Sequence, residues 1–393
     1  MLAAEAARPP VPYAGRTVIA LDPGQLEAIR STVTLLHRLS RLPAYQAAVD
    51  DGAEDIVRFA PGNAGVLMGY DFHVTPAGPR LIEVNTNAGG ALLNGLHTLS
   101  LCDPEKLACL CRDLLPLKTI RERLVETFAA ELSAVRGPEA RLERIAIADL
   151  RPREQFLFPE FELFVELFRE SGIDAAICET ADLTRRSGEL ALDGRRIDLV
   201  YLRDTDFTLA EPRSAALRAA FLAGEVVVTP SPREHHLLAN KRRLALFSSA
   251  VALERFGLGP QQARHLAEVV PETLPLAELG RERAWRERRE WVFKPCAAFG
   301  SRAVYRGDKV SRRKLDEIAA DPTYLAQRRV EPGVVAVETI DGPQSMRFDV
   351  RAYAYRDQVL LLGARVYRGQ VTNLRTPGGG FSAICVSRSP IVP

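Results

Sequence analysis

The stretch Gly69–Gly90, GYDFHVTPAGPRLIEVNTNAGG, predicts a β-hairpin that gathers oxygen ligands on one face of a sheet. Asp71 lies in the strand-like run VLMGYDFHV, turn residues then reverse the chain, and the apolar run LIEVN carries Glu83 and Asn85. Side chains alternate along a strand, so Glu83 and Asn85 share a face. With a five-residue loop over residues 75–79, Asp71 lies opposite Glu83 on that same face.

Two carboxylates and a carboxamide at one place suit Mg²⁺, which takes one or two carboxylates and leaves room for substrate phosphates. The alternative is a half-buried hairpin with an acidic rim. Against that alternative, an acid and an amide that flank a single valine in an apolar strand are costly to bury unpaired. His73 shares the Asp71 face, where a structural role is favoured over that of a general base.

The hairpin segment resembles the closing motif of the ATP-grasp ligases, of the D-alanyl-D-alanine ligase and glutathione synthetase type. The resemblance implies that Asp71, Glu83 and Asn85 hold Mg²⁺, or Mn²⁺ in its place, under the phosphates of ATP. In those enzymes the motif lies at the C-terminal end of the fold, whereas here it comes first.

Length and composition are those of an ordinary globular protein with two or three domains, since 393 residues are too many for one core. The net charge is +2, from 52 basic and 50 acidic residues, which argues against a nucleic-acid partner. The N-terminus lacks the apolar core of a signal peptide, and no run approaches 18 apolar residues. A cytoplasmic protein without a membrane partner is expected.

The six cysteines do not form a disulfide framework. Cys102, Cys109 and Cys111 are close in sequence, but no nearby histidine or second pair completes a zinc spacing. Buried, reduced thiols are expected.

The first 60 residues have a largely helical pattern, strongest in LEAIRSTVTLLHRLSRL, and a second helical stretch begins at Asp103 as an N-cap before Pro104. From RIAIADL to EVVVTP, strand and helix patterns alternate, which predicts a small parallel α/β domain. This block resembles the Rossmann-like domain that precedes the nucleotide-binding lobe of ATP-grasp enzymes. A G-x-G-x-x-G dinucleotide motif is absent after its first strand.

Polar groups gather where the strand IDLVYLR ends, at Arg203, Asp204 and Asp206. The carboxyl ends of parallel strands bind ligands in open α/β sheets, so a substrate-anchoring role is one interpretation. A surface loop with an internal Arg–Asp pair is the other. The residues expected near substrate are Arg203, Asp206, Asn87, Gly89 and Gly379.

Signals for nucleotide binding follow from residue 240 onwards. By resemblance, Lys241 reaches the phosphates, although a solvated lysine would look the same. In WVFKPCAAFGSRAVY a strand delivers Lys294, and the small-residue loop at 298–301, with Gly300 and Ser301, can close over phosphates. The family usually has more glycine in this loop, and here Phe299 stands beside the single one.

The run TYLAQRRVEPG has the form of the strand and hinge that cradle adenine in this family. By resemblance, Gln327 accepts from the adenine amino group and Glu331 holds the ribose hydroxyls. The backbone from Arg328 through Arg329 to Val330 meets the ring edge. An ordinary strand entering a turn is the alternative.

The run FDVRAYAYRDQVLLLGARVYRGQVTNLRTPGGG resembles the D-x-R strand, returning arginine strand and TN-x(n)-GG loop of glutathione-synthetase-like ligases. Arginines bind phosphate and carboxylate through a planar fork of donors. Arg351, Arg365 and Asn373 are therefore assigned to catalysis, with Arg351 on phosphate. Arg368 and a loop at 378–380 accompany them. A solvated basic strand pair would look similar.

The motif that should follow this segment is the one found at residues 69–90, so the resemblance implies a circularly permuted ATP-grasp protein of the α/β (α+β) class with N-terminal helices. The expected units are 1–138, helices and metal hairpin; 139–236, Rossmann-like; 237–345, nucleotide lobe; and 346–393, the return to the catalytic lobe.

The function implied is an ADP-forming carboxylate–amine ligase that uses ATP and Mg²⁺ and forms an acyl phosphate. Its expected partners are small-molecule carboxylate and amine substrates. A small-molecule kinase and an ATP-binding accessory protein remain as alternatives. Neither the substrates nor the oligomeric state can be deduced from the sequence.

Overall fold

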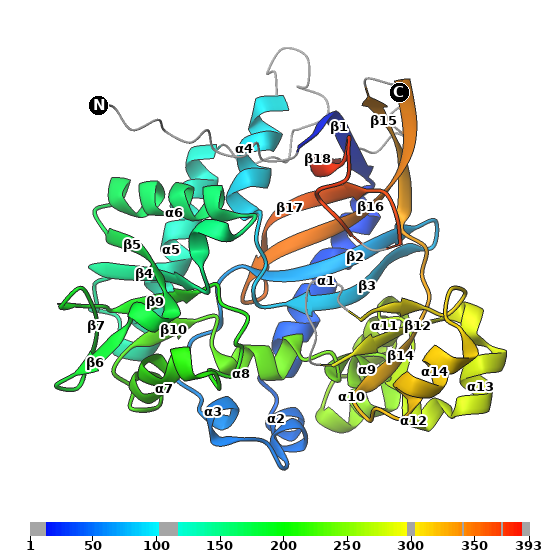
Figure 1. The fold of residues 1–393 in the computed structure, drawn as a ribbon, viewed down its shortest axis with the longest axis horizontal. Coiled ribbons are helices and arrows are strands. Elements are labelled where there is room, and N and C mark those ends of the chain that lie inside the picture. The colour runs from blue at the N-terminus through cyan, green and yellow to red at the C-terminus, as the bar shows by residue number, and fades with distance from the viewer. Residues whose placement is uncertain (1–12, 102–116, 297–302, 340–341, 371, 387–393) are drawn as a thin grey trace.

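The three-dimensional structure is a computed structural model that describes residues 13–101, 117–296, 303–339, 342–370 and 372–386. Within these residues the strands form one seven-stranded sheet, two four-stranded sheets and one three-stranded sheet. Figure 1 shows the three larger sheets in separate parts of the molecule, with the seven-stranded main sheet between the other two.

The main sheet combines strands from both ends of the chain. Its order is β1-β18-β17-β16-β2-β3, and β15 pairs with β16 beside this path. The β2–β3 hairpin lies next to β16 in antiparallel pairing, although about 270 residues separate them in sequence. The strands are β1 (Tyr13–Leu21), β2 (Met68–Thr75), β3 (Gly78–Asn85), β15 (Gly333–Thr339), β16 (Gly342–Tyr355), β17 (Gln358–Tyr367) and β18 (Gly380–Val386).

The predicted hairpin is present, and Asp71 is paired with Glu83 as expected, but the loop differs from the prediction. The reversal is a two-residue turn at 76–77, which alone would shift the register by one residue. A β-bulge at Ile82 inserts one extra residue and restores the pairing of Asp71 with Glu83. The sequence interpretation was therefore right about the pairing and wrong about the loop that produces it.

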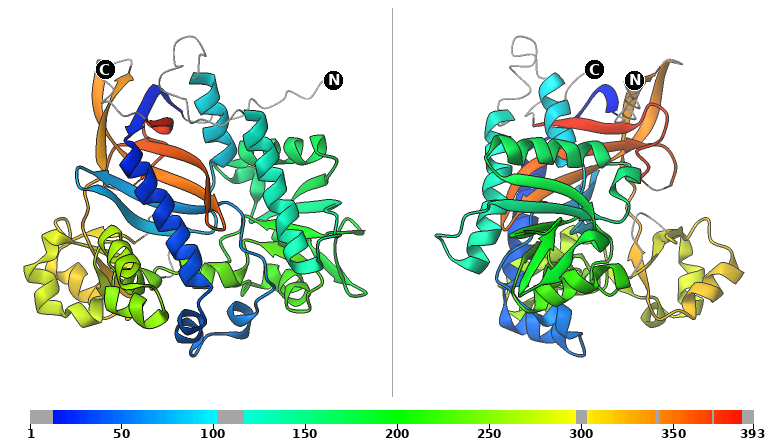
Figure 2. Two further views of the ribbon diagram at one scale, coloured as in Figure 1. Left: turned by 180° about the vertical axis from the view of Figure 1, so that it is seen from behind. Right: turned by 60° about the vertical axis from the view of Figure 1, so that its left-hand side comes forward.

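The two faces of the main sheet have different functions. Even-numbered residues of β16, such as Val350 and Ala352, belong to a core that includes Ile29 and Leu36 of helix α1 (Pro23–Ser40). Figure 2 shows α1 lying across the back of this sheet. Because side chains alternate, the odd-numbered residues of β16 face the opposite side, where the candidate site lies.

The largely helical pattern predicted for the first 60 residues is wrong at β1, which pairs in parallel with β18. Its pairing partner lies more than 350 residues away in sequence, so no local pattern could reveal it. The helical prediction is confirmed for α1, which begins with a capping box between Asp22 and Gln25. Two short helices follow, α2 (Pro43–Asp50) and α3 (Asp55–Arg58).

The predicted parallel α/β block is confirmed as a sheet of order β10-β9-β4-β5. Helices α5 and α6 pack on one face through Phe128, Phe164 and Phe168, and α7 packs on the other. The start of the helix predicted from Asp103, including its proposed cap, lies outside the described residues. The elements are α4 (Ala91–Leu101), α5 (Leu117–Arg136), β4 (Arg144–Asp149), α6 (Phe158–Glu170), β5 (Asp174–Glu179), β6 (Thr184–Arg186), β7 (Glu189–Leu192), β8 (Arg195–Arg196), β9 (Leu199–Leu202), α7 (Ala215–Leu222) and β10 (Val227–Thr229).

The third part contains an antiparallel sheet of order β11-β14-β12-β13, built around the buried Trp291 and Phe293. In the described part of the chain, no helix is both long and apolar enough to cross a bilayer. The elements are α8 (Pro232–Glu234), η4 (His235–Ala239), α9 (Arg243–Phe247), α10 (Ala250–Phe256), α11 (Pro260–Val269), β11 (Thr273–Pro275), α12 (Leu276–Leu279), α13 (Arg281–Arg286), β12 (Trp291–Pro295), β13 (Tyr305–Arg306), α14 (Arg312–Ala319) and β14 (Tyr324–Arg328).

Candidate nucleotide and metal site

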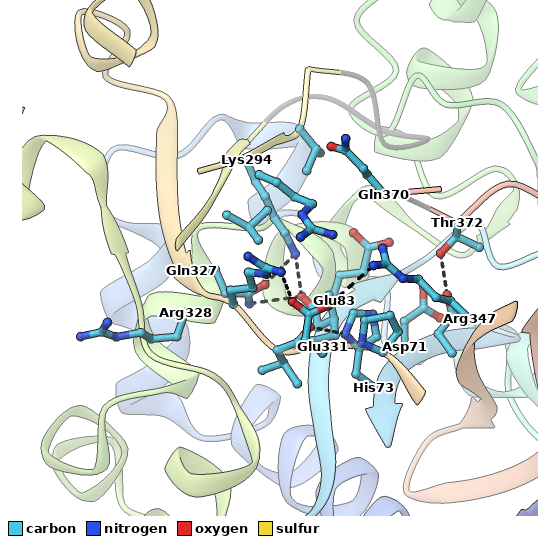
Figure 3. Close-up of a pocket in the computed structure, with 18 of the residues that line it drawn as sticks. Asp71, His73, Glu83, Lys294, Gln327, Arg328, Glu331, Arg347, Gln370 and Thr372 are labelled. Carbon is cyan, nitrogen blue, oxygen red and sulfur yellow. Dashed lines mark hydrogen bonds and ion pairs between the residues drawn. The ribbon is translucent and has the colours of Figure 1, made fainter. Parts of the chain in front are cut away.

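A pocket with about 930 Å³ of empty space, part of it open to solvent, lies between the main sheet and the β11–β14 sheet. Its walls come from segments that are far apart in sequence: the β2–β3 hairpin, Lys241, β12 with β13, residues 327–332, and the strands β16 and β17. Figure 3 shows Asp71, Glu83, Lys294 and Gln327 meeting at its centre. The pocket therefore joins most of the residues that the sequence assigned to a nucleotide and a metal.

Glu83, Asn85 and Asp71 are in mutual contact at the base of the pocket. The Asn85 amide nitrogen lies 3.0 Å from Asp71 Oδ2 and 3.3 Å from Glu83 Oε1. Amide nitrogen and oxygen exchange places on a half-turn of the side chain. Neighbouring oxygens around an octahedral Mg²⁺ lie about 2.9 Å apart, given its 2.0–2.1 Å bonds. The donor set therefore fits this ion.

Asp71 is also bound by two arginines. Arg351 contacts both of its oxygens, with Nε to Oδ1 at 2.6 Å and Nη2 to Oδ2 at 2.7 Å, and Arg365 Nη2 lies 2.9 Å from Oδ2. Burial favours a higher pKa for this carboxyl, but the two guanidinium groups more than offset it and hold the pKa of Asp71 below its ordinary value. Asp71 is therefore a buried, charged anchor of the sheet as well as a candidate metal ligand.

Glu83 differs from Asp71 because 29% of its side chain is exposed and its nearest cation, Lys241 Nζ, is 4.0 Å away. No cluster of three or more histidine, cysteine, aspartate or glutamate side chains suited to a metal is found among the described residues. The metal assignment thus depends on two carboxylates and the Asn85 amide, and it remains a prediction.

Lys294 and Gln327 form a buried pair on adjacent strands β12 and β14. Lys294 Nζ donates to Gln327 Oε1 at 2.6 Å and to the Ile82 carbonyl at 3.4 Å, and Gln327 Nε2 donates to the same carbonyl at 3.3 Å. The bulged residue Ile82 therefore connects the metal hairpin to this pair. Burial lowers the pKa of the Lys294 ammonium to about 8, although Glu83 acts in the opposite direction.

Residues 328–331 follow β14, and only part of this segment faces the pocket. The Val330 carbonyl lies 2.8 Å from His73 Nδ1, which connects the segment to the hairpin. Burial lowers the pKa of His73, so its ring is neutral and Nδ1 is the donor in this contact. Glu331 is half exposed and pairs with Arg329.

Arg328 was expected to bind the cofactor, but its side chain points away from Lys294 and Glu83 (Figure 3). It pairs with Glu272 and Glu290 and lies over the Trp291 ring at 4.2 Å. A charge on the outer side of β14 is better stabilised by these surface partners than by the pocket. Only the backbone of Arg328 remains available for the predicted role.

The loop at 298–301 lies outside the described residues, and with it the predicted phosphate contacts of Gly300 and Ser301. Cys102, Cys109 and Cys111 lie outside them as well. Cys178, Cys296 and Cys385 are free thiols.

Asp349 and Thr372 were missed as site residues, although both line the pocket. Asp349 is buried opposite Arg365 in the β16–β17 register, accepts from Arg365 Nε at 2.6 Å and accepts from Thr372 Oγ1 at 2.5 Å. Strand alternation could have identified Asp349, because it lies two residues before Arg351 on the same face. Asn373 is exposed, and its side chain accepts from the Arg375 amide within a turn.

Of the residues expected near substrate, Asp206 already has a structural role. Its carboxylate accepts from the amides of Ala210 and Glu211 and from Ser214 Oγ at 2.6 Å, which fixes the loop before α7. Asp204 is held by both ends of the Arg213 guanidinium. These contacts support the alternative of a self-paired surface loop for the two aspartates.

Arg203 and the loop after the hairpin do meet. Arg203 is buried beside Tyr201 and Phe161, its Nη1 lies 3.1 Å from the Tyr201 hydroxyl, and its carbonyl accepts from the Asn87 amide. A Cβ on Gly89 would lie 2.8 Å from Arg203 Nη2, so glycine is needed there for close approach. Gly379 is packed in the same way, since a Cβ would lie 2.5 Å from the Val366 carbonyl.

Comparisons with known proteins agree with this arrangement at the level of the fold. A glutathione synthetase-like effector, GSS30 from Globodera pallida, is similar with a TM-score of 0.57 over 96% of this chain and 89% of its own, at 12% identity. A γ-glutamylcysteine synthetase-type protein from Methylobacillus flagellatus has a TM-score of 0.49 at 12% identity, over 90% of this chain and 85% of its own. The ATP-grasp ligase PsnB, solved with Mg and ADP, has a TM-score of 0.32 at 18% identity, over 57% of this chain and 89% of its own. No protein-family model matches the sequence, and no curated protein matches it.

The chain therefore has the mixed α/β fold of the glutathione synthetase-like, ATP-grasp kind, as the sequence predicted. The circular permutation and the four domain boundaries remain predictions, because no comparison tests the order of the segments or the division of the chain.

Proposed function

We propose that the protein is an ATP-dependent, ADP-forming ligase that joins a carboxylate to an amine through an acyl phosphate. The observation that supports it best is the convergence of the hairpin carboxylates, Lys294 with Gln327, and Arg365 in one pocket, from three distant segments of the chain. Similarity to ligase structures supports an ATP-dependent ligase in general, and the finer chemistry is part of the proposal.

In this proposal the residues of the pocket bind and orient the substrates rather than react themselves. Gln327 and the backbone near Val330 hold the adenine, Glu331 holds the ribose, and Lys294 and Lys241 lie along the phosphates. Asp71, Glu83 and Asn85 would hold Mg²⁺, which supplies positive charge against the transferred phosphoryl group. Arg365 adds a fixed cation beside them, and such preorganised charge is the main source of rate in phosphoryl transfer.

One observation favours a second candidate, an ATP-binding protein without ligase turnover. Both oxygens of Asp71 are engaged by arginines, so a metal would have to share or displace these contacts. The two candidates differ in the expected behaviour of Glu83, which is treated in the Discussion.

The mechanism is tested by isotope scrambling. With ATP, Mg²⁺ and the correct acid alone, the ligase should move ¹⁸O between the β,γ-bridging and non-bridging positions of ATP, because reversible transfer lets the β-phosphate of bound ADP rotate. Hydroxylamine should then capture a hydroxamate, detected by mass spectrometry. An alcohol kinase gives no hydroxamate, so a stable phosphate ester as product, or AMP as the nucleotide product, would contradict the ligase proposal.

Replacing Lys294 with methionine should weaken ATP binding by about ten- to a hundred-fold, the ~1.5–3 kcal/mol of a hydrogen bond to a charged group. The native protein should lose affinity as pH rises through about 8, because its lysine loses the proton that the phosphates need. The variant lacks that proton and should show no such decline.

Calorimetric titration of ATP at pH 7 and pH 9 measures both effects of the Lys294→Met substitution. An exposed lysine on α14, Lys314, is the matched control, and Lys314→Met should bind ATP as the native protein does. Equal affinities of the native protein and Lys294→Met at pH 7 would remove Lys294 from the phosphate site.

A further inference from the structure

A second hollow continues from the nucleotide pocket along the main sheet. This basic groove, defined by residues 306–309, 345–347 and 367–370, has about 910 Å³ of empty space and is widely open to solvent. Four residues line both the groove and the pocket: Arg306, Arg347, Tyr367 and Gln370. The groove is therefore an extension of the candidate site, with one wall on β13 and the other on β16 and β17.

The strand register gives the distance between groove and site. Arg347 is paired with Tyr367, and the next pair on the same face is Asp349 with Arg365. Two residues along a strand span about 7 Å. A chain lying in the groove can thus place one end beside Arg365 while the rest contacts the residues farther out. Figure 3 shows Arg347, Thr372 and Gln370 on this side of the pocket.

The charge of the groove is strongly one-sided. It contains four basic side chains, Arg306, Lys309, Arg347 and Arg368, and the single carboxylate of Asp308. Asp308 is already bound by Arg306 through two contacts of 3.0 and 3.1 Å. Arg347 lies 3.9 Å from its nearest carboxylate, on Glu331.

Lys309 and Arg368 carry the uncompensated charge. Both are exposed, and among the described residues neither side chain has an ion-pair or hydrogen-bond partner. Neither lines the nucleotide pocket, so both lie beyond the residues that would bind a triphosphate there. Unpaired cations in a concave surface attract an anionic ligand and bind carboxylates directly.

We infer that the basic groove binds an acidic peptide segment, so that the acid activated in the pocket belongs to a chain with several carboxylates. This inference rests on the proposed function, which requires a carboxylate next to the transferred phosphate. Further carboxylates on the same chain would then lie against Lys309, Arg368 and Arg347, as acidic motifs do on arginine clusters. A nucleic acid fits less well, because the only aromatic side chain of the groove, Tyr367, is 2% exposed and offers no stacking surface.

The test is direct binding of a fluorescein-labelled oligoglutamate peptide, followed by fluorescence anisotropy. The native protein should bind it, and a labelled oligoglutamine of equal length should not bind. The double variant Lys309→Glu/Arg368→Glu should lose about ten-fold or more in affinity, because like charges then face each other. Lys309→Gln/Arg368→Gln should be intermediate. Raising the ionic strength should weaken the native complex and have less effect on the double variants.

The matched control is Arg30→Glu/Arg264→Glu, on exposed positions of α1 and α11. It makes the same change in net charge away from the groove, and oligoglutamate affinity should stay within about two-fold of the native value, as for distant surface charges under screening. Thermal unfolding and ATP titration of each variant show that fold and nucleotide pocket are intact.

The inference is overturned if oligoglutamate binds the groove variant as tightly as the native protein, or fails to bind a native protein that binds ATP. Tighter binding of a labelled oligothymidylate of equal charge overturns it in favour of a nucleic acid. The proposed function fails separately, if the native protein does not bind ATP.

Discussion

Glu83→Gln should leave the protein folded and remove its Mg²⁺-dependent ATP turnover, a loss on the order of a hundred-fold or more, as for removal of one preorganised group in an active site. Glutamine has the same shape, and the Glu83 side chain is partly exposed, so the hairpin has little reason to change. What is lost is one of the two carboxylate charges of the metal set. The native protein should bind ATP more tightly with Mg²⁺ than with EDTA, and the variant should show little difference.

Turnover is measured as ADP release with pooled carboxylic acids and amines, and binding is measured by calorimetry. Glu338→Gln, at an exposed position of β15 in the same sheet, is the matched control and should behave as the native protein. Near-native turnover in a folded Glu83→Gln protein would contradict the metal assignment. A native protein with Mg²⁺-dependent ATP binding but no turnover on any substrate would favour the accessory protein.

Asp71→Asn should instead destabilise the fold, by about 3–5 kcal/mol, the cost of removing one partner from a buried ion pair. Arg351 and Arg365 are buried around this carboxylate, and Arg351 would lose its charged partner. Urea unfolding measures the change, and Glu83→Gln, which should cost little, is the comparison. An unfolding free energy within about 1 kcal/mol of the native value, typical of a surface substitution, would mean that the arginines do not depend on Asp71.

The two substitutions separate functions that the sequence could not separate. Asp71 and Glu83 are similar in the sequence, since each is a carboxylate in an apolar strand. Only the antiparallel neighbour β16 reveals that Asp71 is opposite Arg351 while Glu83 opens into the pocket. The position of that neighbour depends on long-range pairing, which no pattern within the hairpin contains.

The pattern-based predictions succeeded where periodicity is local. The α/β block from β4 to β10 and helix α1 were predicted from alternating strand and helix patterns, and the resemblance correctly indicated the fold. Predictions failed where a partner distant in sequence decides the outcome. Strand β1 exists because β18 pairs with it, and Arg328 turns outward because Glu272 and Glu290 receive it.

Side-chain roles were harder to predict than elements. A loop aspartate such as Asp206 can bind a ligand or cap backbone amides, and the sequence does not distinguish these roles. The structure places three donors around it. Conversely, Asp349 is part of the quoted D-x-R strand, yet its contact with Arg365 follows only from the register of β16 and β17.

The joining of early and late strands in the main sheet affects the order in which the protein is made. Asp71 and Arg351 are 280 positions apart. At about 5–20 residues per second, a ribosome needs on the order of tens of seconds to travel between them. During that interval the β2–β3 hairpin has an open edge, its aspartate has no arginine, and a lone hairpin is barely stable. The catalytic surface is therefore the last part of the described fold to assemble, after the α/β block and the β11–β14 sheet have left the ribosome.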